Sequence, residues 1–513
     1  MDLNVIDYGA FLLFIAVVVA VSLYASRKEE SDTDYFLAGR GLAWWLIGFS
    51  LIASNISTEH FVGMSGSGFG AMGLAVASYE WIAAVTLVAV ALVMLPLYLR
   101  LGIHTMPEFL EHRYGSGPRA LMAVFMLVMY VAVALASILY SGGLVIETIF
   151  GLPLVWGVWV IGALAAAYTI YGGLKAVVWS DLLQGAALLF GGLLVMVLGF
   201  KAVGGAGEFF AANGDKLHMI LPADDVDIPW TAMLLGIWIP NFFYWGCNQF
   251  ITQRTLGAKS LRHGQNGIVF AALIKLVIPF IIVLPGIMAF QLAAAGQLEV
   301  GAADTAYPAL IKELLPVGLR GLMLAALFGA VMSSLDSMLN SASAIFTMDL
   351  YKRHLSPTAG PRKLVQVGRA MTAVFVLFGC LIAPGLANPA FKGIFNYIQM
   401  FQGFISPGIV TVFLFGLIVR RAPTPAAVIA MLLNIPIYGL LLWLLPDVAF
   451  LNHMAITFII LVAVMTLITI VRPLPAPVRF KAQSGLDLTP SPFAKWGGAA
   501  VIVLTVILYV VFW

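Results

Sequence analysis

The 513-residue chain contains few charged residues and only two cysteines. Lys, Arg, Asp and Glu make up 10% of it, far below the roughly 25% of a typical soluble domain. Hydrophobic residues make up 62%, and the mean hydropathy is +1.01. This composition excludes a soluble domain with one membrane anchor and favours a single transmembrane domain over residues 1–513. Cys247 and Cys380 lie in apolar runs, which predicts neither a disulfide framework nor a cysteine metal site.

Catalytic motifs are also absent from the sequence. The chain has no His-Glu-x-x-His, no Gly-x-Ser-x-Gly and no cytoplasmic cluster of carboxylates or histidines with metal-ligand spacing. We therefore expect no enzyme and assign no catalytic residue.

Apolar runs of about 20 residues, long enough to cross a bilayer as helix, recur along almost the whole chain. The first run has no small-residue cleavage site after it and is expected to be a retained helix. The sequence therefore predicts an all-α polytopic membrane protein with about fourteen transmembrane helices. The expected spans are 7–26, 43–70, 74–99, 119–150, 153–172, 178–203, 229–253, 266–293, 320–349, 366–386, 397–418, 425–446, 453–471 and 496–513.

Most of the 27 Lys and Arg residues fall in connections that are cytoplasmic if the N-terminus lies outside. Arg254, Arg420 and Arg421 are among them. Because Lys and Arg favour the cytoplasmic side, we expect a multi-pass protein of the plasma membrane, the inner membrane of a bacterium, with both termini outside.

Two expected spans are interrupted by polar residues. Residues 54–60 read Ser-Asn-Ile-Ser-Thr-Glu-His and precede a glycine-rich stretch, and residues 240–249 interrupt the seventh span. Glycines alone could reflect close helix packing, but Asn55, Glu59, His60 and, one span later, Glu80 are too polar for that. Matching breaks predict an inverted-repeat carrier with repeats at 43–203 and 229–418, an extra helix at 7–26 and extra helices at 425–513, and they favour a carrier over a channel.

Charged and hydroxyl side chains at membrane depth are candidates for the ion site. The hydroxyls of Ser333 and Ser334 are hard ligands suited to a small cation, although each could instead bond the carbonyl one turn back. Asp181 and Asp336 could bind a cation, pair with a basic residue or carry a proton. Lys275 lies in an apolar run and should face a wet cavity or a partner.

The remaining polar residues at membrane depth suit a polyhydroxylated solute. His60, Glu80, Asn241, Lys275 and Gln399 mix donors with acceptors. Three aromatic residues, Tyr79, Tyr244 and Trp245, offer faces for a sugar ring, although position alone fits packing or interfacial aromatics equally well.

At these residues the sequence resembles the sodium/solute symporter family, and within it the sodium-glucose and sodium-galactose cotransporters. The resemblance runs nearly end to end, through Ser50 to Ser57 (SLIASNIS), Gly63 to Gly68 (GMSGSG), Ala77 to Trp81 (ASYEW), Tyr171 to Leu174 (YGGL), Asn241 to Trp245 (NFFYW), Gln253 to Leu256 (QRTL), Gly267 to Ala272 (GIVFAA) and Ser341 to Tyr351 (SASAIFTMDLY).

The resemblance implies a five-plus-five inverted-repeat, LeuT-like core and uptake of a solute driven by sodium. It implies a sodium site made by the carbonyls of Ala53, Ile56 and Ala330 with the hydroxyls of Ser333 and Ser334. Asp181 would lie near the inner ion path. The implied sugar site comprises Asn55, His60, Glu80, Asn241, Lys275 and Gln399, with Tyr244 as an inner gate and Trp245 beside it.

Departures from the bacterial galactose pattern bear on the substrate. His60 replaces a glutamine, Ala83 replaces a serine, Ala134 replaces an asparagine and Asp336 replaces a small residue. The two alanines remove two hydrogen bonds to the sugar, which disfavours galactose. We expect sodium-coupled symport of another hexose; the alternatives are a polyol such as inositol, a nucleoside, a carboxylate or an amino acid. The sequence does not predict the oligomeric state.

Overall fold

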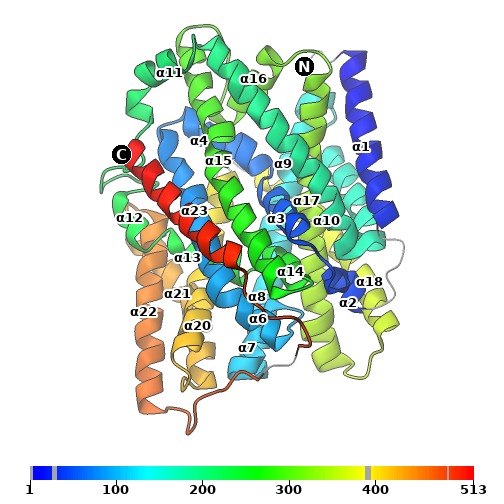
Figure 1. Ribbon diagram of the computed structural model, residues 1–513, viewed down its shortest axis with the longest axis vertical. Helices are drawn as coiled ribbons and strands as arrows, with labels where there is room; N and C mark the ends of the chain where they lie inside the picture. The colour runs from blue at the N-terminus through cyan, green and yellow to red at the C-terminus, as the bar shows by residue number, and fades with distance from the viewer. Residues whose placement is uncertain (1–3, 26–31, 388–393, 482–483) are drawn as a thin grey trace.

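The computed structural model describes residues 4–25, 32–387, 394–481 and 484–513 (Figure 1). Within these ranges all regular secondary structure is helical, apart from two isolated β-bridges. Ten of the described helical stretches are long and apolar enough to cross a membrane. Two shorter apolar helices, at Leu154–Ala167 and Ser406–Ile418, accompany them. The predicted all-helical membrane protein is therefore confirmed, whereas the count of fourteen stays a prediction.

The α-helices are α1 (Val5–Ala25), α2 (Asp32–Leu37), α3 (Trp44–Asn55), α4 (Ser65–Phe69), α5 (Ser78–Ala89), α6 (Leu95–Leu101), α7 (Met106–Tyr114), α8 (Ser116–Val128), α9 (Ala136–Phe150), α10 (Leu154–Ala202), α11 (Ala206–Ala212), α12 (Trp230–Leu234), α13 (Trp238–Phe242), α14 (Gln249–Leu256), α15 (Leu261–Ala294), α16 (Ala306–Leu314), α17 (Leu319–Ile345), α18 (Pro361–Ile382), α19 (Ile394–Gln402), α20 (Ser406–Ile418), α21 (Thr424–Leu444), α22 (Phe450–Val471) and α23 (Pro492–Val511). Shorter 3-10 turns are η1 (Ala38–Arg40), η3 (Gly73–Ala77), η6 (Gly214–Lys216), η8 (Ala303–Thr305) and η10 (Ala383–Ala387). Wider π-helical turns are η2 (Glu59–Met64), η4 (Val90–Met94), η5 (Met129–Leu135), η7 (Phe243–Cys247) and η9 (Phe346–Leu355).

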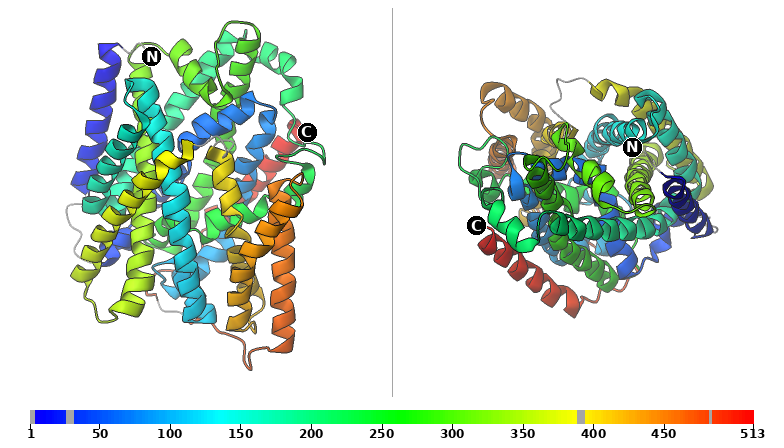
Figure 2. Two further views of the ribbon diagram at one scale, coloured as in Figure 1. Left: turned by 180° about the vertical axis from the view of Figure 1, so that it is seen from behind. Right: turned by 90° about the horizontal axis from the view of Figure 1, so that it is seen from above.

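The helices run roughly along the long axis of the molecule, with α1 at one edge and α22 at the opposite edge (Figure 1). The start of α1 and the C-terminus lie in the half of the molecule that carries α11 and α16 (Figure 1). Seen from behind, the rod formed by α8, η5 and α9 stands between α18 and the α20–α22 group (Figure 2). The connection that follows α22 lies at the end away from α11 (Figure 1).

The first predicted break is present and divides α3 from α4. Helix α3 ends at Asn55, and Ile56 has extended backbone angles (φ −76°, ψ 99°). In a continuous helix the Ser57 amide would bond the Ala53 carbonyl, but here it donates to Nδ1 of His60 at 3.5 Å. The chain then continues through η2 into α4. Backbone carbonyls are thereby released from the helix near its end, as a carrier's ion site requires.

The second predicted break separates η7 from α14. Asn248 is extended (φ −84°, ψ 121°), and its side chain caps α14 by accepting from the Phe250 amide at 3.3 Å. The hydroxyl of Tyr130 bonds Oδ1 of Asn248 and accepts from the same amide at 3.1 Å. A side chain from η5 thus satisfies backbone that the break exposes, which is the condition for unwound helix at membrane depth.

Helix α15 is held in register with α3 along its first half. The Trp44 amide donates to Nδ1 of His263 at 3.2 Å, so the two helices start side by side. One turn on they cross closely, because a Cβ at Gly48 would lie 3.0 Å from the Gly267 carbonyl oxygen. Two turns further Lys275 reaches Asn55 at the break. Small residues at the crossing therefore bring the buried lysine to the unwound segment.

The region of two expected spans, 153–172 and 178–203, is assigned to the single element α10 in the structure. Its part from Leu174 to Ala202 is long enough to span a membrane by itself, whereas the part before it is shorter. Neither a proline nor a long polar stretch separates the two expected spans in the sequence, and the helix continues through residues 172–178.

Candidate substrate and ion site

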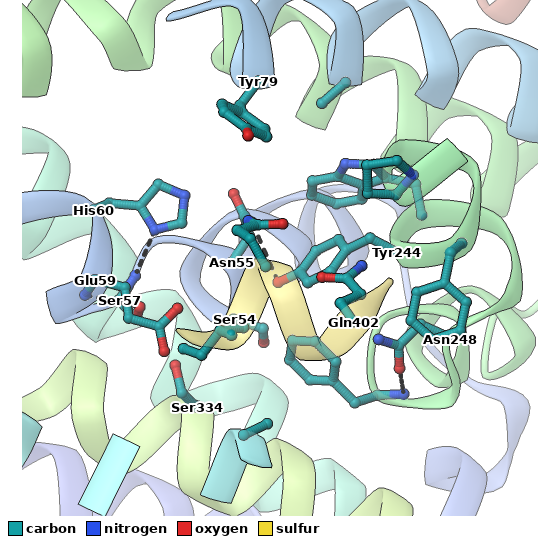
Figure 3. Close-up of a pocket in the computed structure, with 18 of the residues that line it drawn as sticks. Ser54, Asn55, Ser57, Glu59, His60, Tyr79, Tyr244, Asn248, Ser334 and Gln402 are labelled. Atoms are coloured by element: carbon teal, nitrogen blue, oxygen red, sulfur yellow. Dashed lines mark hydrogen bonds between the residues drawn. The ribbon is translucent and has the colours of Figure 1, made fainter. Parts of the chain in front are cut away.

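A cavity of about 130 Å³ lies between the two breaks (Figure 3). Elements from both halves of the chain line it, including η2, α5, η5, η7, α15, α17 and α19. All nine residues predicted to bind the solute or gate it line this one cavity: Asn55, His60, Tyr79, Glu80, Asn241, Tyr244, Trp245, Lys275 and Gln399. Side chains separated by more than 300 residues in the sequence are therefore brought together.

Lys275 is fully buried and has found the partners that its burial requires. Its Nζ donates to Oδ1 of Asn55 and to Oε2 of Glu80. The ammonium also lies 4.9 Å from the centre of the Trp245 ring, within cation–π range. An ion pair of this kind is stable in a low-dielectric site only when both ions are fully hydrogen-bonded. The lysine therefore joins the first break to α5 and to the aromatic residues of the second break.

His60 completes the shell around Glu80. Its Nε2 lies 3.4 Å from Oε1 of Glu80, while its Nδ1 faces the Ser57 amide. A neutral imidazole that accepts at Nδ1 carries its proton on Nε2 and can donate it to the carboxylate. The ring orientation at the cavity wall is thus set by the unwound backbone of the first break.

Tyr244 and Trp245 form an aromatic wall. Their ring centres are 5.1 Å apart in an edge-to-face arrangement, and Phe250 lies 5.5 Å from Tyr244. The Tyr244 hydroxyl accepts from Nδ2 of Asn55 at 3.2 Å, so Asn55 links the wall to the first break. Figure 3 shows Tyr79 and Ser334 at opposite ends of the cavity and Tyr244 across from His60.

Two predicted amide side chains have unused hydrogen-bonding capacity. Asn241 donates to the Ile237 carbonyl at 2.9 Å, which leaves its Oδ1 as an acceptor. Oε1 of Gln399 is buried and accepts no hydrogen bond from the described residues. Because burying an unpaired polar atom costs free energy, such atoms at a cavity wall indicate a ligand or ordered water.

The five predicted sodium ligands lie on α3, its non-helical end and the middle of α17, two helices that pack against each other. Ala53, Ile56 and Ala330 are buried. Oγ of Ser334 is buried without a partner among the described residues, and Ser334 also lines the cavity. Ser333 instead donates to Oδ1 of Asp181. The structure thus places one hydroxyl without a described partner on a helix that packs against α3, and the sodium site itself stays a prediction.

Asp181 lies in a dense network with a buried arginine. Nη2 of Arg254 is 3.0 Å from Oδ2 of Asp181, and both side chains are completely buried. Ser50 and Ser54 donate to the same oxygen at 2.5 and 3.1 Å. Of the roles left open for Asp181, the structure has the ion pair. Arg254, which was expected in a connection, instead lies within α14 and is buried. Its side of the membrane stays a prediction.

Asp336, the other carboxylate predicted on the ion path, is buried, and only one of its two oxygens has a described hydrogen-bond partner. Thr169 of α10 donates to its Oδ1 at 2.6 Å, and Oδ2 has no partner among the described residues. One turn further along α17, Asn340 is buried with both ends of its amide unpaired in the described part of the chain. Asp336 and Asn340 thus form a polar site on α17 that lies C-terminal to Ser334.

Sequence reasoning missed several residues of the cavity. Tyr130, Asn248 and Gln402 line it, and Tyr130 and Asn248 also stabilise the second break. Glu59 was recognised as too polar for packing but was given no role, and it too lines the cavity. The available signal was the proximity of Asn248 and Glu59 in sequence to predicted site residues; nothing local marked Tyr130.

Comparison with known proteins agrees with this architecture. Residues 35–434 match the model of the sodium:solute symporter family. The chain is 40% identical to the sodium/glucose cotransporter of Vibrio parahaemolyticus, over 100% of this chain and 99% of that protein. It is 37% identical to sodium/myo-inositol cotransporter 2 of Sus scrofa, covering 84% of this chain and 68% of that one.

Among solved structures, a sodium-coupled sialic acid symporter in an outward-open, substrate-bound state matches with a TM-score of 0.83. That match has 23% identity and covers 93% of this chain and 99% of the other, so it supports the fold alone. The family model spans most of the chain, and the relatives match it nearly throughout. The chain therefore belongs to the sodium:solute symporter family: it is a sodium-coupled solute transporter of the membrane and not an enzyme.

Proposed function

We propose that the protein carries a hexose into the cell together with sodium by alternating access around the cavity between the two breaks. The observation that carries this proposal is the composition of the cavity wall. It combines an aromatic wall, two carboxylates, an ammonium and amides with unused acceptors. A sugar needs such a mixture, because each hydroxyl both donates and accepts and the ring has an apolar face.

Coupling follows from the position of the first break. The proposed sodium ligands Ala53 and Ile56 lie within two residues of Asn55, which bonds both Lys275 and Tyr244. Sodium bound to the released carbonyls and to Ser334 would hold the unwound segment in one geometry. That geometry also orients His60 and Asn55 toward the solute. Ion and solute would thus favour the same conformation, which is the thermodynamic content of symport.

The ion path is proposed to continue past Asp181 and Asp336. Asp181 would release Ser333 to the ion while remaining paired with Arg254. Asp336 and the unpaired amide of Asn340 would provide the next polar step along α17. We further infer fourteen transmembrane helices with two five-helix inverted repeats, a bacterial inner-membrane location and both termini outside.

A polyol such as inositol is the second candidate. Ala83 and Ala134 both line the cavity, so the two positions that would bond a galactose in the bacterial pattern supply no polar atom. A relative that shares 37% identity is a sodium/myo-inositol cotransporter. A ring with hydroxyls placed differently from those of galactose therefore suits this wall.

The test is sodium-driven uptake in proteoliposomes with a competition panel. Labelled glucose is the transported probe, and unlabelled hexoses, myo-inositol, a nucleoside and proline are the competitors. We expect uptake only with an inward sodium gradient and competition by hexoses or inositol. Absence of sodium-driven glucose uptake, with sodium-driven uptake of labelled proline or nucleoside in the same vesicles, would contradict the proposed substrate.

A further inference from the structure

We infer that Glu59 is a specificity-determining residue that binds hydroxyl donors of the solute and rejects solutes carrying a negative charge. The inference deepens the proposed function and rests on it. It concerns a side chain that neither the helix break nor the lysine network uses.

The position of Glu59 supports a direct role. It is the first residue of η2, lines the cavity and is partly buried. Its backbone amide donates a hydrogen bond to Oγ of Ser57 at 3.2 Å, which fixes the backbone at this position. No described residue donates a hydrogen bond to the Glu59 carboxylate or forms an ion pair with it. In Figure 3 it lies on the same side of the cavity as His60, across from Tyr244 and Gln402.

The charges at the cavity wall are unbalanced without an ion. Among the lining residues that the structure describes, the carboxylates are Glu59 and Glu80, and the only Lys or Arg is Lys275. The ammonium of Lys275 already bonds Glu80 and Asn55 and faces the Trp245 ring. In its ionised form Glu59 leaves one negative charge at the wall, which one sodium ion at the neighbouring site would neutralise.

A neutral set accepts an uncharged solute and opposes an anion. A carboxylate on the solute would find no unused cation among the described lining residues. To pair with Lys275 it would have to displace Glu80, which would leave a buried carboxylate without its ion partner. The like charge of Glu59 adds to this cost. Hydroxyls, in contrast, can donate to both oxygens of Glu59 in charge-assisted hydrogen bonds.

The test compares neutral sugars with their uronates in proteoliposomes. The measured quantity is the ratio of inhibition constants for glucose and glucuronate, and for galactose and galacturonate, against the neutral solute taken up fastest. For the unchanged protein we expect the uronate to bind at least about 100-fold more weakly, as an uncompensated buried charge requires. In Glu59→Gln this ratio should fall about tenfold, since one like charge is removed at constant shape.

Two variants serve as controls. Glu59→Asp keeps the charge and should keep the discrimination. Glu208→Gln removes an exposed carboxylate from α11 and should change nothing. An unchanged ratio in Glu59→Gln, or a change in sodium dependence with no change in the ratio, would overturn the role of Glu59. Equal uptake of glucose and glucuronate by the unchanged protein would overturn charge rejection while leaving sugar symport intact. Sodium-driven uptake of none of the neutral solutes would instead refute the proposed function itself.

Discussion

The buried pair of Lys275 and Glu80 should be mutually dependent, and its disruption is the sharpest test of the cavity. Lys275 is completely buried and the Glu80 side chain is 4% exposed. In Lys275→Met the Glu80 carboxylate keeps, of its partners in the described part of the chain, only His60 at 3.4 Å. Breaking a buried pair by removing one partner costs about 3–5 kcal/mol, because the remaining charge is left uncompensated. We expect Lys275→Met and Glu80→Met each to lower the melting temperature of the purified protein clearly.

The double variant separates stability from function. With both residues replaced by Met, no charge is stranded, and we expect most of the lost thermal stability to return. Transport should remain absent in all three variants, because the polar contacts to the solute are gone. Melting is followed in detergent and uptake in proteoliposomes. A double variant whose loss of stability equals the sum of the two single losses would refute the coupling, and hence the ion pair.

Three further substitutions test separate parts of the site. Ser334→Ala removes a hydroxyl without a described partner, so the sodium concentration for half-maximal uptake should rise about tenfold, the effect of one lost ligand. Its control on the same helix is Ser343→Ala, whose hydroxyl bonds the Asn340 carbonyl at 3.0 Å, and an equal effect of both would argue against the ion site. Gln399→Ala should weaken sugar binding about tenfold with sodium dependence retained, measured by counterflow; full retention of binding would remove it from the cavity contacts. Tyr244→Ala should speed efflux of preloaded solute, whereas Tyr244→Phe, which loses only the 3.2 Å bond to Asn55, should have a smaller effect; equal efflux in all forms would contradict a gate.

The sequence was most informative where polar residues interrupt an apolar run. Asn55, Glu80 and Lys275 could each be recognised alone as costly in lipid, and the structure joins them in one network. The two breaks were predicted for the same reason. Unwound backbone at membrane depth needs hydrogen-bond partners, and polar side chains that interrupt an apolar run can supply them.

Residues that act through tertiary contacts were not predictable in this way. Tyr130 stabilises the second break, yet a tyrosine in an apolar helix has no distinctive local pattern. The expected seventh span ended at residue 253, which put Arg254 in the following connection, whereas α14 continues to Leu256 and Arg254 pairs with Asp181 of α10. The two spans expected in residues 153–203 are one helical element in the structure, and the composition changes little where the boundary between them was placed.

Reciprocal fluxes in one vesicle preparation test the central claim most directly. Proteoliposomes receive labelled hexose and ²²Na⁺, and each flux is measured with and without the other species. Because linkage is mutual, we expect sodium to accelerate hexose entry and hexose to accelerate sodium entry, with both effects abolished together in Ser334→Ala combined with Lys275→Met. Hexose entry that proceeds equally with potassium in place of sodium, or ²²Na⁺ entry that ignores the sugar, would contradict a shared site at the two helix breaks.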